Sequence, residues 1–443
     1  MKTYKGKGRG IDRRSLLKYS AAAGALAATG GMPMPAIAQA KPIKIGYVSP
    51  ATGPLAAFAA ADEFMLNQFR QATKAGLKVG NSTRQIEVIL KDSQSNPNRA
   101  AQVAKDLIVQ DKVDLMLVGN TPETTNPVCT QCEIEEVACV SSLAPWQPWF
   151  IGQQANPGGG PPAWKPFNYV YHYFWGLEDV IAVFTNMWSQ LETNKVVGAL
   201  FPNDADGNAW GDKQVGFPPA LDKLGYKLFD PGRYQNLTDN FSPQITAFKN
   251  AKAEIITGVV LPPDFTTFWK QSLQQGYKPK AASVGKAILF PSSVEALGKD
   301  GNNLSSEVWW TPNHPFKSSM TGQTAKQLAD AFESATKRQW SQPIGFAHSL
   351  YEVGLDVLKR TGGDIGNSKA TAAAIAKTNL DTVVGKVQWN GQGVPPFAAK
   401  NVTKTSLVGG QWRTKDGKRY DIVITDNKTA TNIPLDGKME AIA

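Results

Sequence analysis

Three cysteines are the first residues whose types and spacing suggest chemistry. Cys129, Cys132 and Cys139 fall within eleven residues, and none of the three histidines of the chain is near them in sequence. A structural zinc site takes about four ligands, and this group supplies three. The sequence therefore predicts no metal site at the cysteines.

The acidic segment "NDADGN" (203–208) is a second candidate because it contains Asp204 and Asp206. It begins like a calcium-binding loop but lacks the glutamate that closes the twelve-residue pattern. It is also a good turn sequence. The chain has no G-x-S-x-G elbow, no phosphate-binding P-loop and no other cofactor fingerprint. We therefore expect a protein that is not an enzyme and holds no cofactor.

Tryptophans and prolines alternate in "VSSLAPWQPWF" (140–150), which contains Trp146 and Trp149. So many aromatic residues are typical of a core, whereas Pro145 and Pro148 are typical of a loop. The prolines predict a loop that holds Trp146 at the opening of a cleft, with Trp149 and Phe150 packed under the chain crossover that follows.

Strand-like and helix-like stretches alternate along the first half of the chain. The predicted elements are 43–48, 57–76, 85–90, 98–110, 113–119, 123–135 and 138–142. Such alternation predicts βαβ units with a parallel sheet. Because "DLMLVG" (114–119) has no polar face, that sheet should be covered on both sides.

The pattern restarts after the Pro/Gly-rich segment 152–168. The elements predicted there are 179–191, 196–201, 211–225, 254–261, 264–276 and 286–290, then helices at 322–340 and 345–361 and a β-rich tail. About 400 residues exceed what one core usually serves, so two α/β lobes are expected.

Six predicted strands are followed by segments rich in Gly, Pro, Ser, Thr, Asn or Asp. These segments are 49–54, 92–98, 119–127, 141–148, 202–211 and 262–264. Each alone is ordinary turn chemistry. Together they would share one edge of each sheet, and ligands bind at the carboxyl ends of strands in open α/β sheets. The pattern favours a ligand site there.

Residues 1–40 predict a cleaved export signal. A basic region with Arg13 and Arg14 precedes a short apolar stretch, and Ala38 and Ala40 fit a small-residue cleavage site. The segment "DRRSLLK" resembles a twin-arginine signal, which marks proteins exported in folded form. The mature chain would begin at Lys41 in the periplasm.

The signal also carries most of the positive charge. The whole chain has 47 Lys and Arg against 37 Asp and Glu, a net charge of +10; seven basic residues and one acidic residue lie in 1–40, which leaves +4 for the mature chain. No basic patch interleaved with aromatic residues follows, so nucleic acid is not expected as a partner. No later stretch is long enough to span a membrane.

Export to the periplasm permits disulfides. We predict a Cys132–Cys139 disulfide that joins a helix to the next strand and leaves Cys129 unpaired. Spacing alone does not fix the connectivity, so other pairings remain open.

The stretches "IKIGYVSPATGPLAAF", "LKDSQSNPNRAAQVAKDLIVQDKVDLMLVG" and "GKVQWNGQG" resemble the branched-chain amino-acid-type (type I) periplasmic binding proteins, which serve ABC transporters. The resemblance runs over essentially all of 41–443. It implies two doubly wound α/β lobes joined by three crossovers that close on a small solute. The amino-terminal lobe would hold 41–170 and 313–390, and the carboxyl-terminal lobe 171–312 and 391–443. The implied partners are the solute and, transiently, a permease, with the protein a monomer.

The resemblance also suggests site residues. In amino-acid binders of the family, hydroxyls and N–H groups on two loops hold the ligand carboxylate. Those loops align with 119–124 and 141–146, which gives the following candidates: Thr121, Thr124, Ser141, Ser142, Ala144 and Trp146. Pro145 stands where a hydroxyl is expected, and proline has neither a hydroxyl nor an N–H.

The second lobe departs further from amino-acid binders. Lys286 aligns with the acidic residue that pairs with a ligand ammonium, and a lysine there would repel that group. Asp206 aligns with an aromatic residue that covers the ligand. The candidate walls are Trp146, Trp149, Trp175, Trp210, Trp309 and Trp310.

These residues favour a carboxylate with an apolar or aromatic body, with Lys286 as its partner and Trp309 as a wall. Asp204 and Asp206 would equally bind the hydroxyls of a sugar or polyol, or a cation. A branched-chain amino acid or amide binder remains an alternative, as does a protein that reports its ligand to a membrane sensor. A periplasmic oxidoreductase is a weaker alternative.

Overall fold

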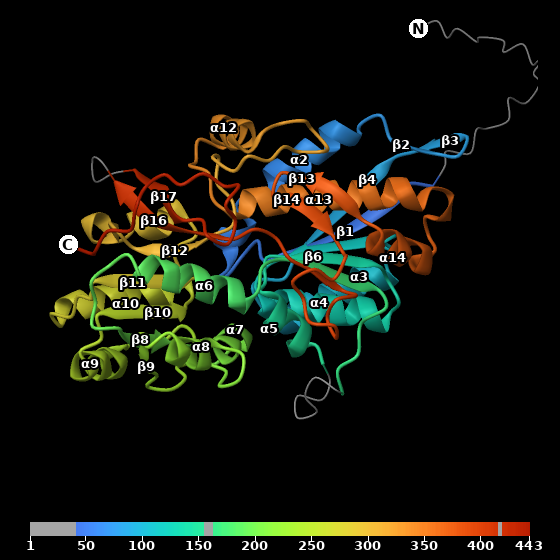
Figure 1. Cartoon of the computed structure of the whole chain (residues 1–443). Coiled ribbons are helices and arrows are strands. Elements are labelled where there is room, and N and C mark those ends of the chain that lie inside the picture. The colour runs from blue at the N-terminus through green and yellow to red at the C-terminus, as the bar shows by residue number, and fades with distance from the viewer. Residues whose placement is uncertain (1–40, 155–162, 415–418) are drawn as a thin grey trace, which may run out of the picture. The chain divides into compact units, whose positions relative to one another are not determined.

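Buried apolar strands form two separate sheets in the computed structural model, which describes residues 41–154, 163–414 and 419–443 (Figure 1). The predicted signal, residues 1–40, lies outside these ranges. The first sheet has the order β15 (Val402–Thr403), β7 (Val170–Tyr173), β6 (Cys139–Ser142), β5 (Leu115–Gly119), β1 (Ile43–Ser49) and β4 (Ile86–Asp92). All of its pairings are parallel.

The second sheet is parallel except at one edge. Its order is β17 (Tyr420–Asp426), β16 (Val408–Thr414), β12 (Ser305–Val308), β11 (Ala281–Gly285), β10 (Ile255–Val259), β8 (Val196–Leu200) and β9 (Lys227–Phe229). Only β16 and β17 run antiparallel to their neighbours. In both sheets the first strand in sequence lies between two later ones, which creates a crevice at its carboxyl end.

Helices cover both faces of the first sheet because β5 buries side chains on each face. Met116 and Val118 pack with α3 (Pro97–Val109) and α4 (Pro122–Ile134) in one apolar cluster. Leu115 and Leu117 pack with α2 (Asp62–Thr73) and α13 (Pro343–Thr361) in the other. Successive strand side chains point to opposite faces, so the two clusters lie on the two sides of the sheet.

The remaining described elements are further helices and two small hairpins. The helices are η1 (Ala56–Ala59), α5 (Trp146–Gly152), α6 (Leu177–Trp188), α7 (Ala205–Trp210), α8 (Phe217–Lys223), α9 (Ser242–Ala251), α10 (Pro262–Gln274), α11 (Pro291–Glu295), η3 (Gly298–Gly301), α12 (Ala325–Thr336), η4 (Gly362–Asp364) and α14 (Ser368–Ala376). Two small hairpins are β2 (Leu77–Val79) with β3 (Ser82–Arg84), and β13 (Asn379–Thr382) with β14 (Gly385–Gln388).

Within the described residues the chain passes between the sheets three times. It leaves the first sheet after β7, returns from the second after β12, and crosses again between β15 and β16. The predicted fold class, with two mostly parallel sheets covered by helices, is confirmed. The predicted lobe boundaries differ from the sheets at two points, because β7 spans residue 170 and β15, from the tail 391–443, pairs with β7.

Two local predictions are wrong. The strand predicted at 286–290 is replaced by β11, which ends at Gly285 and is followed by a turn. The loop predicted around Trp146 contains α5, with Pro145 as its N-cap and Pro148 in its first turn. Proline is tolerated there because the first-turn N–H groups have no partner within the helix.

The predicted Cys132–Cys139 disulfide is also wrong, since all three cysteines are free and buried. The sulfur of Cys129 lies 4.0 Å from that of Cys139, and the Trp149 indole N–H donates to the Cys129 sulfur at 3.4 Å. The thiols pack among apolar side chains between α4 and β6, where they behave as small hydrophobic groups.

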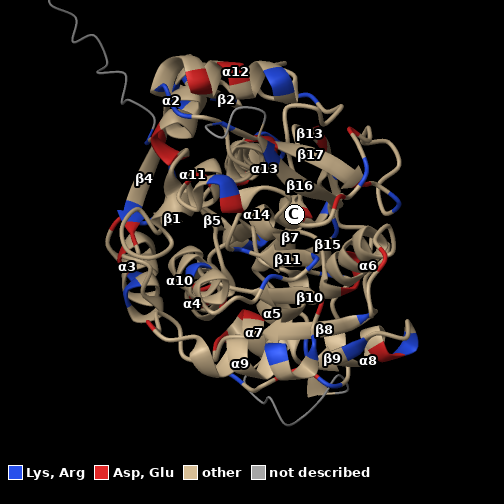
Figure 2. Ribbon diagram, turned by 90° about the vertical axis from the view of Figure 1, so that its left-hand side faces the viewer, with Lys and Arg blue, Asp and Glu red and all other residues tan. Residues whose placement is uncertain are grey.

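Charge is mixed over the surface elements. Figure 2 shows both basic and acidic residues on α8 and on α12. Among the described helices, none combines the length and apolar character that crossing a bilayer requires.

A buried carboxyl near β1 makes stability depend on pH. Asp62 accepts hydrogen bonds from Ser49 and, at 3.3 Å, from Tyr47, and burial raises its pKa from 3.8 to about 7. The folded state therefore binds more protons than the unfolded state between these values. The contribution of Asp62 to the free energy of unfolding is complete below about pH 3.8 and is lost as the pH rises through about 7.

We predict that Asp62→Asn stabilises the protein increasingly as the pH rises from about 5 to about 7.5. The gain should grow by at most about 1.4 kcal/mol per pH unit, since one proton is involved. Urea unfolding of both proteins across this range measures it. Asp222→Asn at an exposed position serves as the control, and a difference between Asp62→Asn and wild type that does not change with pH would contradict the prediction.

Candidate functional site

The carboxyl ends of strands from both sheets surround a small cavity, here called the central pocket. Its lining residues lie at the carboxyl ends of β10 and β12 or follow β1, β5, β6, β7, β8, β11 and β12: Phe58, Thr121, Leu143, Pro145, Phe174, Trp175, Asp206, Trp210, Val259, Lys286, Leu289, Glu307 and Trp309. The cavity volume is about 20 Å³, room for about one water molecule. The cleft is therefore filled by its own side chains.

Lys286 is the charged centre of this pocket. Its ammonium lies 2.9 Å from a carboxylate oxygen of Asp206, 3.6 Å from Asp204 and 3.7 Å from Glu123. The lysine side chain is only 5% exposed. Glu123 is at the start of α4, on the first sheet, whereas the other three residues belong to the second. The ion pairs thus join the two sheets across the cleft.

Burial and charge act in opposite directions on these groups. Burial disfavours the Lys286 ammonium, but the three carboxylates outweigh it and raise its pKa well above the usual value. Burial raises the pKa of Asp206 to about 7, although Lys286 opposes this shift. Glu307 also reaches a pKa of about 7, chiefly through burial. The lysine stays charged, and burial favours the neutral form of both carboxyls.

Short helices and polar bonds hold the acids in place. Asp204 caps α7 by accepting from the Gly207 N–H at 2.8 Å and also accepts from Asn236 at 2.8 Å. Glu307 accepts from the backbone N–H of Lys286 at 3.1 Å and from Ser306 at 2.7 Å. Their geometry is therefore fixed before any solute arrives.

Two residues of the pocket have left-handed backbone conformations. Leu143 has φ 71° and Lys286 has φ 68°. Non-glycine residues rarely adopt such angles, and they do so mostly where the surrounding structure imposes them at functional sites. β11 ends at Gly285, and the turn that follows directs the Lys286 side chain into the cleft.

Several polar groups at the pocket lack a partner among the described residues. They are the Thr121 hydroxyl, the indole N–H groups of Trp175 and Trp210, and one oxygen of Asp206, whereas the Trp309 side chain interacts with the Glu307 carboxyl. Buried polar groups are normally hydrogen-bonded. Because an indole N–H can only donate, the unpaired set is dominated by donors.

Aromatic rings form the walls. Phe174 packs edge-to-face on Trp309 with ring centroids 5.2 Å apart and lies 4.8 Å from Trp175. Trp309 is held by its backbone N–H, which donates to Gln342 at 2.8 Å. The walls therefore offer flat apolar area with fixed orientation.

The structure brings together part of the predicted set. Thr121, Asp206, Lys286 and Trp309 line the central pocket, and Asp204 is ion-paired beside it. The remaining predicted residues do not line it: Thr124, Ser141, Ser142, Ala144 and Trp146. Thr124 is buried with an unpartnered hydroxyl in the first turns of α4.

The predicted residues of the 141–146 loop bond within the protein. Ser141 contacts His172 Nδ1 at 2.9 Å, and His172 Nε2 lies 2.7 Å from the Ala144 carbonyl oxygen. Ser142 donates to the Tyr173 carbonyl at 2.6 Å. Trp146 donates through its indole to Glu178 at 3.2 Å. These bonds fix the loop that carries Leu143 and Pro145.

Sequence reasoning missed seven residues of the pocket and its ion-pair cluster: Phe58, Glu123, Leu143, Phe174, Val259, Leu289 and Glu307. Glu123 lies in a polar loop that the sequence did single out, so its position was a usable signal. No sequence signal indicated Glu307, because it lies in a strand that is recognised as buried only in the folded protein. Of the predicted tryptophan walls, Trp175 and Trp210 line the pocket, whereas Trp149 stacks on His172 and Trp310 donates to Val383.

No cluster of three or more His, Cys, Asp or Glu suited to a metal ion occurs within the described ranges. The lysine ammonium occupies the place among the acids that a cation would take.

Two family models match the chain. The periplasmic binding protein model matches residues 42–404, and the twin-arginine translocation signal model matches residues 10–30. A search of curated proteins finds no match.

Solved structures share the fold at low sequence identity. The isoleucine complex of a branched-chain amino acid transporter substrate binding protein from Streptococcus pneumoniae is 16% identical, with 86% of this chain and 99% of that chain covered and a TM-score of 0.67. An ABC transporter solute binding protein from R. palustris with 4-hydroxybenzoate is 16% identical, with coverage of 88% and 98% and a TM-score of 0.67. Another from Rhodopseudomonas palustris, with 3,4-dihydroxybenzoic acid, is 18% identical, with coverage of 88% and 99% and a TM-score of 0.65.

Removal of the buried lysine should be costly. We predict that Lys286→Met destabilises the protein by about 3–5 kcal/mol at neutral pH, because it leaves buried carboxylates without a partner. Adding Asp206→Asn should recover part of the loss. Lys326→Met, at an ion pair with Asp330 where the lysine side chain is 68% exposed, should cost less than about 1 kcal/mol. Urea unfolding measures all four proteins, and equal losses at the two lysines would contradict the prediction.

Proposed function

The chain belongs to the periplasmic binding protein family, and from this premise we propose that it captures a small organic carboxylate with an aromatic or apolar body for an ABC transporter. It is a solute-binding protein rather than an enzyme, and its twin-arginine signal directs it to the periplasm. What needs support from the site is therefore the class of solute.

The donor-rich wall carries the proposal. The indole N–H groups of Trp175 and Trp210 and the hydroxyl of Thr121 have no described partner, and they lie in the same pocket as the Lys286 ammonium. Leaving a buried donor unpaired costs about 1–3 kcal/mol. A solute that presents acceptor oxygens would satisfy these groups, and a carboxylate presents two with a charge that suits Lys286.

The acids around Lys286 do not exclude a carboxylate. Asp206 and Glu307 have pKa values of about 7 and are readily protonated, so each can donate a hydrogen bond to an anion. Protonation also leaves Lys286 with fewer competing carboxylates. The solute carboxylate would then take over part of the pairing that Asp206 now provides.

Binding requires the cleft to open. The central pocket holds about 20 Å³, and a benzoate-sized solute needs several times the space of one water. Family members bind between lobes that close, and a solute that contacts both sheets stabilises the closed form. Phe174 and Trp309, at two of the crossings between the sheets, would then cover the aromatic body. The permease would recognise the two sheets in this fixed relation.

An amino acid is the second candidate. The three carboxylates within 4 Å of Lys286 would also accept a solute ammonium if the lysine moved aside. The similar solved structures include one with isoleucine and two with hydroxylated benzoates, so likeness of fold supports either class. The unpaired donors favour the carboxylate.

We predict that benzoate or 4-hydroxybenzoate raises the melting temperature of the mature chain more than leucine, valine, benzamide or glucose does. A ligand at 100 times its Kd stabilises by about 2.7 kcal/mol. Lys286→Gln should weaken benzoate binding at least about tenfold and leave leucine unaffected or improved. Lys299→Gln, an exposed lysine outside the pocket, is the control. A melting shift with leucine alone, or benzoate binding that survives Lys286→Gln, would contradict the carboxylate proposal.

We further predict that carboxylate affinity is constant below about pH 7 and falls as the pH rises above it. A bound anion raises the pKa of Asp206 and Glu307 above their unliganded values of about 7, so the complex binds more protons than the free protein. Each proton contributes up to about a tenfold change in Kd per pH unit.

Isothermal titration in buffers of different ionisation enthalpy measures this proton uptake directly. Benzamide, which has no charge, should bind with a smaller pH slope than benzoate. Benzoate affinity that increases with pH, or binding without proton uptake at pH 8, is incompatible with this electrostatic arrangement.

A further inference from the structure

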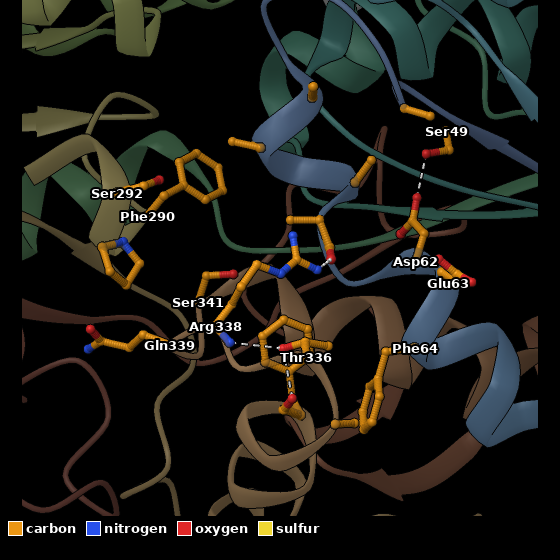
Figure 3. A pocket seen from close by; sticks show the side chains of 18 of the residues that line it. Ser49, Asp62, Glu63, Phe64, Phe290, Ser292, Thr336, Arg338, Gln339 and Ser341 are labelled. Atoms are coloured by element: carbon orange, nitrogen blue, oxygen red, sulfur yellow. Dashed lines mark hydrogen bonds between the residues drawn. The ribbon is translucent and has the colours of Figure 1, made fainter. Parts of the chain in front are cut away.

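A second and much larger cavity opens beside the central pocket; we call it the side groove. Its volume is about 1250 Å³. One wall comes from η1 and α2 after β1, another from α11 after β11, and the third from α12 and the segment that follows it. Figure 3 shows Phe290 and Ser292 on one side of this space, Asp62, Glu63 and Phe64 on another, and Arg338 between them.

A pair of packed rings lies at the boundary between the side groove and the central pocket, and we call it the partition. Phe58 lines the central pocket and Phe290 lines the groove, and they pack edge-to-face with centroids 5.0 Å apart. Next to Phe290 the chain runs from one cavity to the other, because Leu289 lines the central pocket and Pro291 lines the groove. The two cavities are therefore adjacent, and the Phe58–Phe290 pair lies between them.

The partition comes from both sheets. Phe58 follows β1, whereas Phe290 follows β11. Any motion that opens the cleft between the sheets separates these two rings. A solute that enters the open cleft would therefore meet one continuous space, and the rings would close around it rather than block it.

The walls of the groove suit an apolar occupant. The η1 wall exposes four alanines, which leave space where larger side chains would fill it: Ala56, Ala57, Ala59 and Ala60. Aromatic rings of Phe64, Phe290 and Phe332 line the same space. Covering such concave apolar surface removes it from water, which is favourable in proportion to the area.

The charges of the groove are largely engaged or at its rim. Arg338 donates to the Ala60 carbonyl oxygen at 2.6 Å and lies 5.5 Å from the Phe332 ring. Asp62 is bonded to Ser49 and Tyr47. Glu63 and Glu295 are exposed. Lys337 is also exposed, so the buried carboxyl of the groove, Asp62, is already bonded within the protein and the other charges reach solvent.

We propose that the side groove is a second subsite of the solute-binding cleft, which takes an apolar tail of a solute whose carboxylate head lies in the central pocket. This inference rests on the proposed function and narrows it to elongated carboxylates, such as aryl acids with an alkyl or aryl extension. It also accounts for the disparity between a head pocket of about 20 Å³ and a neighbouring space of about 1250 Å³.

The test uses 4-alkylbenzoates of increasing tail length, from benzoate through the methyl, butyl and hexyl derivatives, titrated into the mature chain. In the wild type, Kd should fall about fourfold per methylene while the tail is buried. Ser292→Trp fills the groove from an exposed position of α11. It should leave benzoate affinity unchanged and abolish the gain with tail length.

Two further variants keep the result interpretable. Glu295→Trp, also exposed and on the groove, is a second way to fill it, should Ser292→Trp fold poorly. Ala296→Trp is exposed at the end of the same helix but does not line the groove, so it should keep the wild-type dependence on tail length. Melting temperatures establish that each variant is folded.

The outcomes separate this inference from the proposed function. If benzoate binds but the gain per methylene is zero in the wild type, or is the same in the groove-filled variants, the groove proposal is overturned and the carboxylate proposal stands. If no alkylbenzoate of any length binds, the carboxylate proposal fails and the groove proposal fails with it.

Discussion

A lysine ammonium buried between two sheets must be neutralised, and the arrangement of the cleft follows from this requirement. Lys286 is directed inward by a left-handed turn after β11. Its partners come from α7 of the same sheet and from Glu123 at the start of α4 on the other sheet. An uncompensated charge at this depth would cost several kcal/mol. The sheets therefore lie in an arrangement that brings Glu123 to the Lys286 ammonium.

The same loops that frame this charge are tied to the crossings between the sheets. Glu178, at the start of α6, accepts from the Trp146 indole at 3.2 Å and pairs with Lys404 at 2.8 Å. Lys404 follows β15, on the last crossing, and Trp146 begins α5 directly after Pro145 of the pocket wall. One carboxylate thus connects the pocket wall to two of the three crossings. This is a contiguous physical link between the pocket and the region where the sheets move relative to each other.

Sequence periodicity predicted the fold because strands buried on both faces and helices with apolar stripes are properties of local sequence. β5, with five buried residues in a row, is the clearest example. Asp206 and Lys286 were predicted as site residues through the resemblance to amino-acid binders, and both line the central pocket. It did not identify Glu307, because a carboxyl within a strand becomes a partner of Lys286 only when β11 and β12 pair. The disulfide prediction was wrong for a related reason, since spacing says nothing of how thiols pack between a helix and a strand.

The closed cleft is stabilised and opposed by groups a few ångströms apart. The Glu123–Lys286 pair joins the two sheets, while the indole N–H groups of Trp175 and Trp210 have no described partner in this form. Asp206 adds to the cost because burial favours its neutral form. A solute shifts such an equilibrium only by its difference in affinity for the two forms. The proposed carboxylate would supply such a difference by pairing the indoles and sharing Lys286, because Trp175, Trp210 and Lys286 line one pocket in this form. Selectivity for the solute and the drive to close would then arise from the same hydrogen bonds.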